Sequence, residues 1–177
     1  AHWQGRLLTQ CSSGWSNHTA VKINALHEKE SPVNIRFLHD DYCDQDIVAA
    51  IRGRGITTVD PLSFKQQLEF KFILFIGVDR LESQLIRFLA SNSVVMKDPL
   101  GFEEWFEHKL VNGKHWIVPD DFASSVVFNL DRALTDPQSL LSMVKASTEF
   151  AVTELNGDVI RCYWHQVLSE YSNLLKF

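Results

Sequence analysis

One stretch of the sequence decides the fold, residues 70–97, which read FKFILFIGVDRLESQLIRFLASNSVVMK. Residues 72–76 form a continuous apolar run, short enough for a strand that is buried on both faces, as in a parallel sheet. Apolar residues then recur at the spacing of one buried helical stripe, at Leu81, Leu85, Phe88 and Leu89. A second buried strand is predicted at residues 93–96, of which the last three are apolar. The stretch therefore predicts a strand, helix, strand unit, with a ligand-facing turn at residues 77–83.

The same alternation continues on both sides of this unit. Further strands are predicted at residues 34–38 and 56–59, and short helices at residues 20–27, 46–52, 61–68 and 102–108. Three longer helices are predicted near the carboxyl end, beginning at Asp121, Asp136 and Asp158. The last of them has its apolar residues on one side. The pattern indicates an α/β domain of three layers with a mostly parallel sheet, a single domain over residues 1–177.

Composition excludes several classes of protein. With 177 residues, 45% of them hydrophobic and 22% charged, the chain is long enough and apolar enough for one globular core. A net charge of -5 and the lack of a basic run argue against a nucleic-acid surface. No apolar run approaches the ~18 residues that a membrane-spanning helix needs. The abrupt start at Ala1 suggests a mature fragment or a piece of a longer protein.

Two local patterns leave alternatives open. Asp44 and Asp46 have the Asp-x-Asp spacing of a divalent-cation site, but they also suit the start of the helix at residues 46–52, with Asp44 as its cap. His39 and Cys43 nearby are alternative metal ligands. Asn17 opens an Asn-His-Thr glycosylation sequon, which indicates either residence in the secretory pathway or a chance triplet.

The central stretch also resembles a known family. Lys71-Phe72, Ile76, Ser83, Leu85 and residues 90–97 fall on the signature of glycosyltransferase family 90, which includes protein O-glucosyltransferases, protein O-xylosyltransferases and capsule xylosyltransferases. The similarity extends to the aromatic segment after residue 101 and to the last helix, and it is weaker before Glu69. Where the family has Asp-Gly, this chain has Gly77-Val78.

The resemblance implies a Rossmann-like domain, the carboxyl-terminal, donor-binding half of a GT-B glycosyltransferase. Such a half binds a nucleotide sugar, of the UDP-glucose or UDP-xylose class, for transfer to a hydroxyl of a protein or glycan, and no metal is expected. A partner domain or subunit would supply the other half, which holds most of the acceptor site, so catalytic residues are unknown here. The family also implies the lumen of the endoplasmic reticulum or Golgi.

Mapped by this resemblance, the donor-binding candidates are Gly5, Arg6, Gly77, Ser83, Gln84, Ser93 and Glu104. Glu104 would accept hydrogen bonds from the ribose hydroxyls, unless it is an ordinary acid at a helix start. Arg6 is either a donor contact or a solvated side chain.

Two positions weaken a catalytic role. The family's diphosphate-binding arginines are replaced by Gln4 and Gln84, and a neutral amide cannot neutralise a departing diphosphate. Two hypotheses therefore remain, a transferase domain or an inactive family member that serves as a structural or interaction subunit.

Overall fold

The computed structural model of the chain describes residues 2–5, 21–22, 34–38, 45–53, 58–60, 62–76, 84–99 and 103–175. The strands of this part are β1 (His2–Gly5), β2 (Asn34–Leu38), β3 (Thr58–Val59), β4 (Phe72–Phe75) and β5 (Val94–Lys97). Its helices are α2 (Gln45–Gly53), α3 (Phe64–Gln67), α4 (Gln84–Leu89), α5 (Phe122–Leu134), α6 (Pro137–Glu154) and α7 (Gly157–Leu174), with a short 3₁₀ helix, η3 (Glu107–Lys109).

Within these residues the strands form one five-stranded sheet in the order β3-β2-β1-β4-β5, and every pair is parallel. The register of β4 on β5 runs from Phe72 opposite Val94 to Phe75 opposite Lys97. Ile117 continues the sheet beyond β5, because its N–H donates to Val95 and its carbonyl accepts from Lys97, at 2.9 and 2.8 Å. The predicted parallel α/β fold is confirmed.

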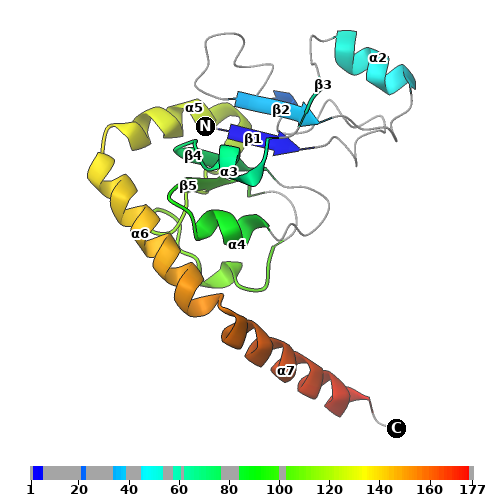
Figure 1. Cartoon of the computed structure of the whole chain (residues 1–177), viewed down its shortest axis with the longest axis vertical. Coiled ribbons are helices and arrows are strands. Elements are labelled where there is room, and N and C mark those ends of the chain that lie inside the picture. The colour runs from blue at the N-terminus through cyan, green and yellow to red at the C-terminus, as the bar shows by residue number, and fades with distance from the viewer. Residues whose placement is uncertain are drawn as a thin grey trace.

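Both faces of β4 and β5 are buried, as the apolar runs predict. Alternate residues of these strands point to opposite faces, and Figure 1 shows α4 and α5 on opposite sides of the sheet. On one face, the core residues are Phe72, Leu74, Val94 and Met96, covered by Phe122, Val126 and Leu130 of α5 and Met143 of α6. On the other face, they are Ile73 and Val95, covered by Leu85, Phe88 and Leu89 of α4 together with Phe106, Trp116 and Phe150. Each such side chain stabilises the fold by about 1.5–3 kcal/mol.

Helix starts follow local capping chemistry. The carboxylates of Asp121 and Asp136 accept the backbone N–H of Ser124 and Ser139, so both predicted caps are confirmed. The helix predicted over residues 61–68 begins later, at Phe64. Ser63 is its cap, and Ser63 and Gln66 satisfy each other's backbone N–H in a capping box.

The helix predicted over residues 102–108 is wrong. The described residues there, 103–110, form turns and the short helix η3, and Phe106 and Glu107 are buried. The aromatic and acidic residues have helical spacing, but the carboxylate of Glu107 is held by Lys97 of β5. This tertiary contact overrides the local pattern.

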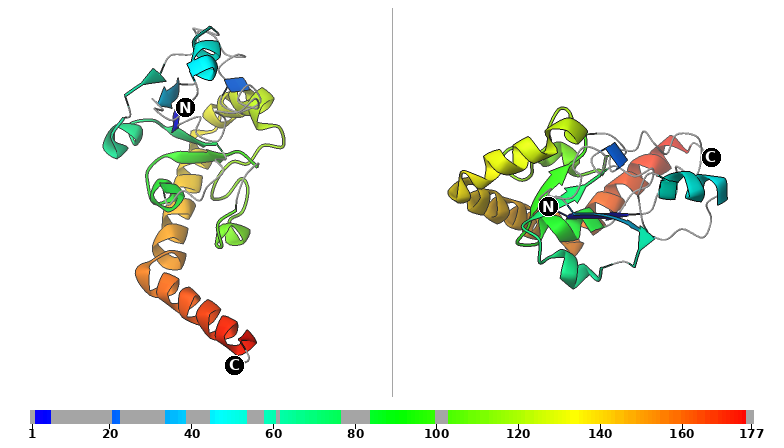
Figure 2. Two further views of the ribbon diagram at one scale, coloured as in Figure 1. Left: turned by 90° about the vertical axis from the view of Figure 1, so that its right-hand side faces the viewer. Right: turned by 90° about the horizontal axis from the view of Figure 1, so that it is seen from above.

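The helix α7 leads away from the sheet in two perpendicular views (Figures 1 and 2). Its apolar side exists as predicted, and in the described part of the chain most of this side is not covered by another element. None of its residues is buried, and its exposed apolar side chains include Trp164, Leu168, Tyr171 and Leu174. No helix in the described residues is long and apolar enough to cross a membrane.

Candidate functional site

The strand order creates a switch point between β1 and β4. From β1 the chain runs outward through β2 and β3, and then returns to place β4 and β5 on the other side of β1. β1 and β4 are neighbours, with His2 opposite Ile73. In open α/β sheets, ligands bind at the carboxyl ends of two such strands, because the segments that follow them leave on opposite sides of the sheet. This edge is the candidate site.

Three of the predicted donor-binding residues lie near this edge. Gly5 is the last residue of β1. Gln84 is exposed and opens α4, the helix that follows β4. Glu104 is half-buried and lies beyond the carboxyl end of β5. Arg6, Gly77, Ser83 and the sequon residue Asn17 fall outside the described residues.

Ser93 is at the opposite edge. It precedes β5, is 1% exposed, and its hydroxyl donates to the Phe70 carbonyl at 2.8 Å. Its N–H donates to the hydroxyl of Ser91 at 3.2 Å. The first contact joins the turn before β5 to Phe70, two residues before β4, and the second lies within that turn. They give Ser93 a structural role at the amino ends of the strands, so we leave it out of the site proposed below.

A buried charge cluster lies at the carboxyl end of β5. The Nζ atom of Lys97 is 2.6 Å from Oε2 of Glu107, and both side chains are 5% exposed. The other oxygen of Glu107, Oε1, accepts the backbone N–H of Glu104 at 3.0 Å. Lys97 also lies over the ring of Trp116, with Nζ 5.6 Å from its centroid. Glu107 therefore connects the end of β5 to the backbone of Glu104, one of the predicted donor-binding residues.

The carboxylate of Glu104 is electrostatically perturbed. Burial raises the pKa of Glu104 above its ordinary value of 4.5, and the nearby charge of Glu107 raises it further. The Lys97 charge acts in the opposite direction. A carboxylate that is partly desolvated forms stronger hydrogen bonds with a hydroxyl donor than one in bulk water. The side chain is therefore suited to accept hydrogen bonds from a diol such as ribose.

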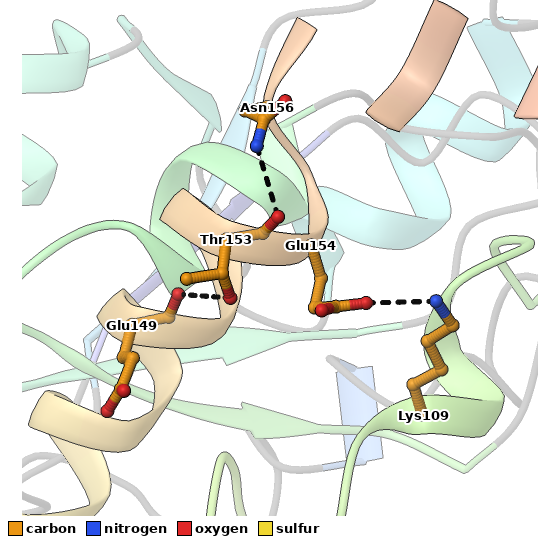
Figure 3. A network of polar contacts seen from close by, with 5 residues as sticks. All are labelled: Lys109, Glu149, Thr153, Glu154 and Asn156. Atoms are coloured by element: carbon orange, nitrogen blue, oxygen red, sulfur yellow. Dashed lines mark hydrogen bonds and ion pairs between the residues drawn. The ribbon is translucent and has the colours of Figure 1, made fainter. Parts of the chain in front are cut away.

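Two contacts link the segment at residues 103–110 to the carboxyl-terminal helices. Trp105 stacks on Tyr163 of α7, with ring centroids 4.1 Å apart. Lys109 forms an ion pair with Glu154 at the end of α6, with Nζ 3.0 Å from Oε2 (Figure 3). Beside this pair, the Thr153 hydroxyl donates to the carbonyl of Glu149, and the Asn156 side chain donates to the carbonyl of Thr153. Together with the Lys97–Glu107 pair, these two contacts hold the segment from β5, α6 and α7.

Arg87, on the helix after β4, is held against an aromatic ring. Its guanidinium carbon lies 3.8 Å from the centroid of the Phe64 ring, in a cation–π contact on α3. The Lys97 ammonium is already paired with Glu107. Arg6 and Arg80, the other arginines close in sequence to the switch point, lie outside the described residues.

The alternative metal site is only partly described. Asp46 is exposed in the first turn of α2, where the positive end of the helix dipole favours a negative side chain. Asp44, His39 and Cys43 lie outside the described residues. Among the residues that are described, no three His, Cys, Asp or Glu side chains form a group that could hold a metal ion. His115 is buried, and its Nδ1 accepts the Val111 N–H at 2.9 Å, so this histidine has a structural role. Burial, and secondarily the charge of Lys114, lowers the pKa of His115.

Comparison with known families decides the classification. A sequence model of glycosyl transferase family 90 matches residues 21–177. The chain belongs to glycosyl transferase family 90. The resemblance in the central stretch and the last helix is therefore a family relationship, and the domain is a sugar-transferase domain by descent.

A relative of known name agrees with this family. Protein O-glucosyltransferase 2 of Danio rerio is 26% identical over 116 residues, which make up 66% of this chain and 23% of that protein. The match thus covers less than a quarter of the relative's length.

Solved structures show the fold. HepE of Anabaena, solved in complex with UDP and glucose, has a TM-score of 0.63 at 13% identity over 96% of this chain and 47% of that one. Sucrose-phosphate synthase of Thermosynechococcus elongatus has a TM-score of 0.59 at 12% identity over 89% of this chain and 43% of that one. The C-terminal domain of the group 1 glycosyl transferase LpcC of Francisella tularensis has a TM-score of 0.54 at 10% identity over 88% of this chain and 85% of that one. The chain therefore has the fold of one GT-B half.

Sequence reasoning missed two features of the site. The strand β1 was not predicted, because His2-Trp3-Gln4-Gly5 has no apolar run, and without it the switch point cannot be located. The pairing of Lys97 with Glu107 was missed as well. A signal for it exists, since Lys97 ends an otherwise apolar strand of four buried residues and a buried lysine requires an acidic partner.

Proposed function

We propose that this chain is the donor-binding domain of a family 90 glycosyltransferase and binds a nucleotide sugar of the UDP-glucose or UDP-xylose class. The observation that carries the proposal is the switch point between β1 and β4, with Gly5 at the carboxyl end of β1, Gln84 at the start of the helix after β4, and Glu104 beyond the carboxyl end of β5. The family match supports the donor class, and so does the fold shared with a protein solved with UDP and glucose.

Each residue has a distinct part in this proposal. Gly5 lets the backbone after β1 approach the ligand closely, because it carries no side chain. Glu104 accepts the ribose hydroxyls. The diphosphate lies near Gln84 and residues 77–83, where the sequence predicts a turn, with the positive charge coming from Arg6 or Arg80 rather than from a metal ion.

The acceptor is a hydroxyl group of a protein or glycan, and a further domain or subunit supplies the acceptor side of the site. Solved neighbours that this chain covers over 43% and 47% of their length support a second half. The exposed apolar side of α7 supports it too, since contiguous apolar surface commonly marks an interaction site. Residence in the secretory pathway belongs to the same proposal and is supported by the family assignment, and glycosylation of Asn17 is supported by its sequon.

The alternative is an inactive family member that serves as a structural or interaction subunit. It is favoured by the neutral residues Gln4 and Gln84 at positions where the family has arginine, and by the engagement of Arg87 with Phe64. A protein of this kind would keep the fold without binding UDP.

The two proposals are separated by the melting temperature with and without UDP. A ligand that binds only the folded state stabilises it by about 2.7 kcal/mol at a hundredfold excess over its dissociation constant, a rise of roughly 5–10 °C for a domain of this size. We expect wild type and Glu103→Gln to show the rise and Glu104→Gln to lose about half of it or more. Glu103 is an exposed neighbour of the same charge and is the matched control. A wild type that does not respond to millimolar UDP supports the subunit alternative.

A further inference from the structure

The Lys97–Glu107 ion pair is unusual because it is buried, at the carboxyl end of β5, whereas most ion pairs are exposed. Both side chains are 5% exposed. Two neighbours, Phe106 at 0% and Trp116 at 5% exposed, belong to one hydrophobic core cluster. Removing two charges from water opposes folding, and apolar residues of similar volume often serve as well or better for stability alone. Stability is therefore a weak reason for this pair.

The geometry of Glu107 suggests what else it does. One carboxylate oxygen accepts from Lys97 at the end of β5, and the other accepts the N–H of Glu104 at 3.0 Å. The N–H of Glu107 in turn donates to the carbonyl of Glu104 at 2.9 Å. Residue 104 is thus tied through both of its backbone polar groups to residue 107. Lys97 fixes residue 107 to the sheet.

We propose that Glu107 and Lys97 are positioning residues that fix the carboxylate of Glu104 for the ribose of the donor. This inference rests on the proposed function, because it assigns Glu104 to the ribose hydroxyls. Neither residue touches the ligand. Their effect passes through the backbone of residue 104, which has no other anchor of this kind to β5 among the described contacts.

The test is selectivity for the ribose hydroxyls, measured as the ratio of the dissociation constants of 2′,3′-dideoxy-UDP and UDP by isothermal titration calorimetry. The wild type should prefer UDP by about tenfold or more, as expected for a charge-assisted hydrogen bond to a hydroxyl. Glu107→Gln cannot accept from both Lys97 and Glu104, so its ratio should fall toward one while its affinity for dideoxy-UDP changes little. If Glu107 had only a structural role, Glu107→Gln would weaken the binding of both ligands equally and leave the ratio of their dissociation constants unchanged.

Two further variants make the test independent of folding. Lys97→Met combined with Glu107→Leu removes the pair without leaving a buried charge, and its ratio should also fall. Glu154→Gln breaks the exposed Lys109–Glu154 pair, whose side chains are each 42% exposed, and should keep the wild-type ratio. The inference is overturned if Glu107→Gln or the double variant has the same ratio of dissociation constants as the wild type.

Two results for the wild type separate this inference from the proposed function. A wild type that binds UDP without preference over dideoxy-UDP overturns the inference and leaves nucleotide binding in place. A wild type that binds neither ligand overturns both.

Discussion

Replacing Lys97 by methionine should strongly destabilise the domain. Methionine keeps the length and apolar contacts of the lysine stem, but the carboxylate of Glu107, 5% exposed, then lacks its cation at 2.6 Å. Removing one partner of a buried pair costs about 3–5 kcal/mol, whereas a whole domain is stable by only about 5–15 kcal/mol. At roughly 2–4 °C per kcal/mol for a domain of this size, the melting temperature should fall by about 6–20 °C.

The assay is urea unfolding, supported by calorimetric melting, on Lys97→Met, Glu107→Leu and the double variant. Both single variants should lose stability, because each leaves a buried charge that has no ion-pair partner. The double variant should recover much of the loss, since replacement of both partners by apolar groups is often neutral or stabilising. A single variant as stable as wild type, or a double variant no better than Lys97→Met, would refute the assignment of a buried, coupled pair.

Three other outcomes are expected. Gln84→Arg should raise UDP affinity about tenfold or more by adding a charge-assisted contact to the diphosphate. Titration calorimetry on wild type and variant measures this change, and an unchanged affinity would show that α4 does not face the nucleotide. Excess EDTA should leave UDP binding unchanged, whereas binding that is lost with EDTA and restored by manganese would show that Asp44 and Asp46 form a metal site. Because the pKa of Glu104 is raised in the folded state, its stabilising contribution is complete below its ordinary value of 4.5 and is lost as the pH rises through the folded-state value. Glu104→Gln should therefore gain stability relative to wild type as the pH rises from about 4 to about 7, and a difference that is flat or shrinks in urea unfolding would contradict the shift.

The sequence predicts those parts of the fold whose signal is local. The strands β4 and β5 lie within one residue of their predicted bounds, because strands buried on both faces read as apolar runs. β2 has the predicted bounds, Asn34–Leu38. The order of the strands is not local information, and β1, the central strand, has too little apolar character to be found.

The limits at the candidate site have the same origin. Family resemblance places Glu104 and Ser93 together in a list of donor-binding residues, but only the sheet topology shows that they lie at opposite ends of β5. The apolar spacing of α7 predicts an amphipathic helix. It does not say what the apolar side contacts, because periodicity describes one element and not its partner.

The three contacts that hold residues 103–110 are unequal. The exposed Lys109–Glu154 pair contributes roughly 0–1 kcal/mol, and the stack of Trp105 on Tyr163 roughly 0.5–1.5 kcal/mol beyond its buried area. Loss of one partner from the buried Lys97–Glu107 pair costs about 3–5 kcal/mol. The buried pair also contacts the backbone of Glu104 itself, whereas the other two act on neighbouring residues. The position of Glu104 is therefore set mainly from β5, so breaking the Lys109–Glu154 pair should alter stability slightly and ribose selectivity not at all.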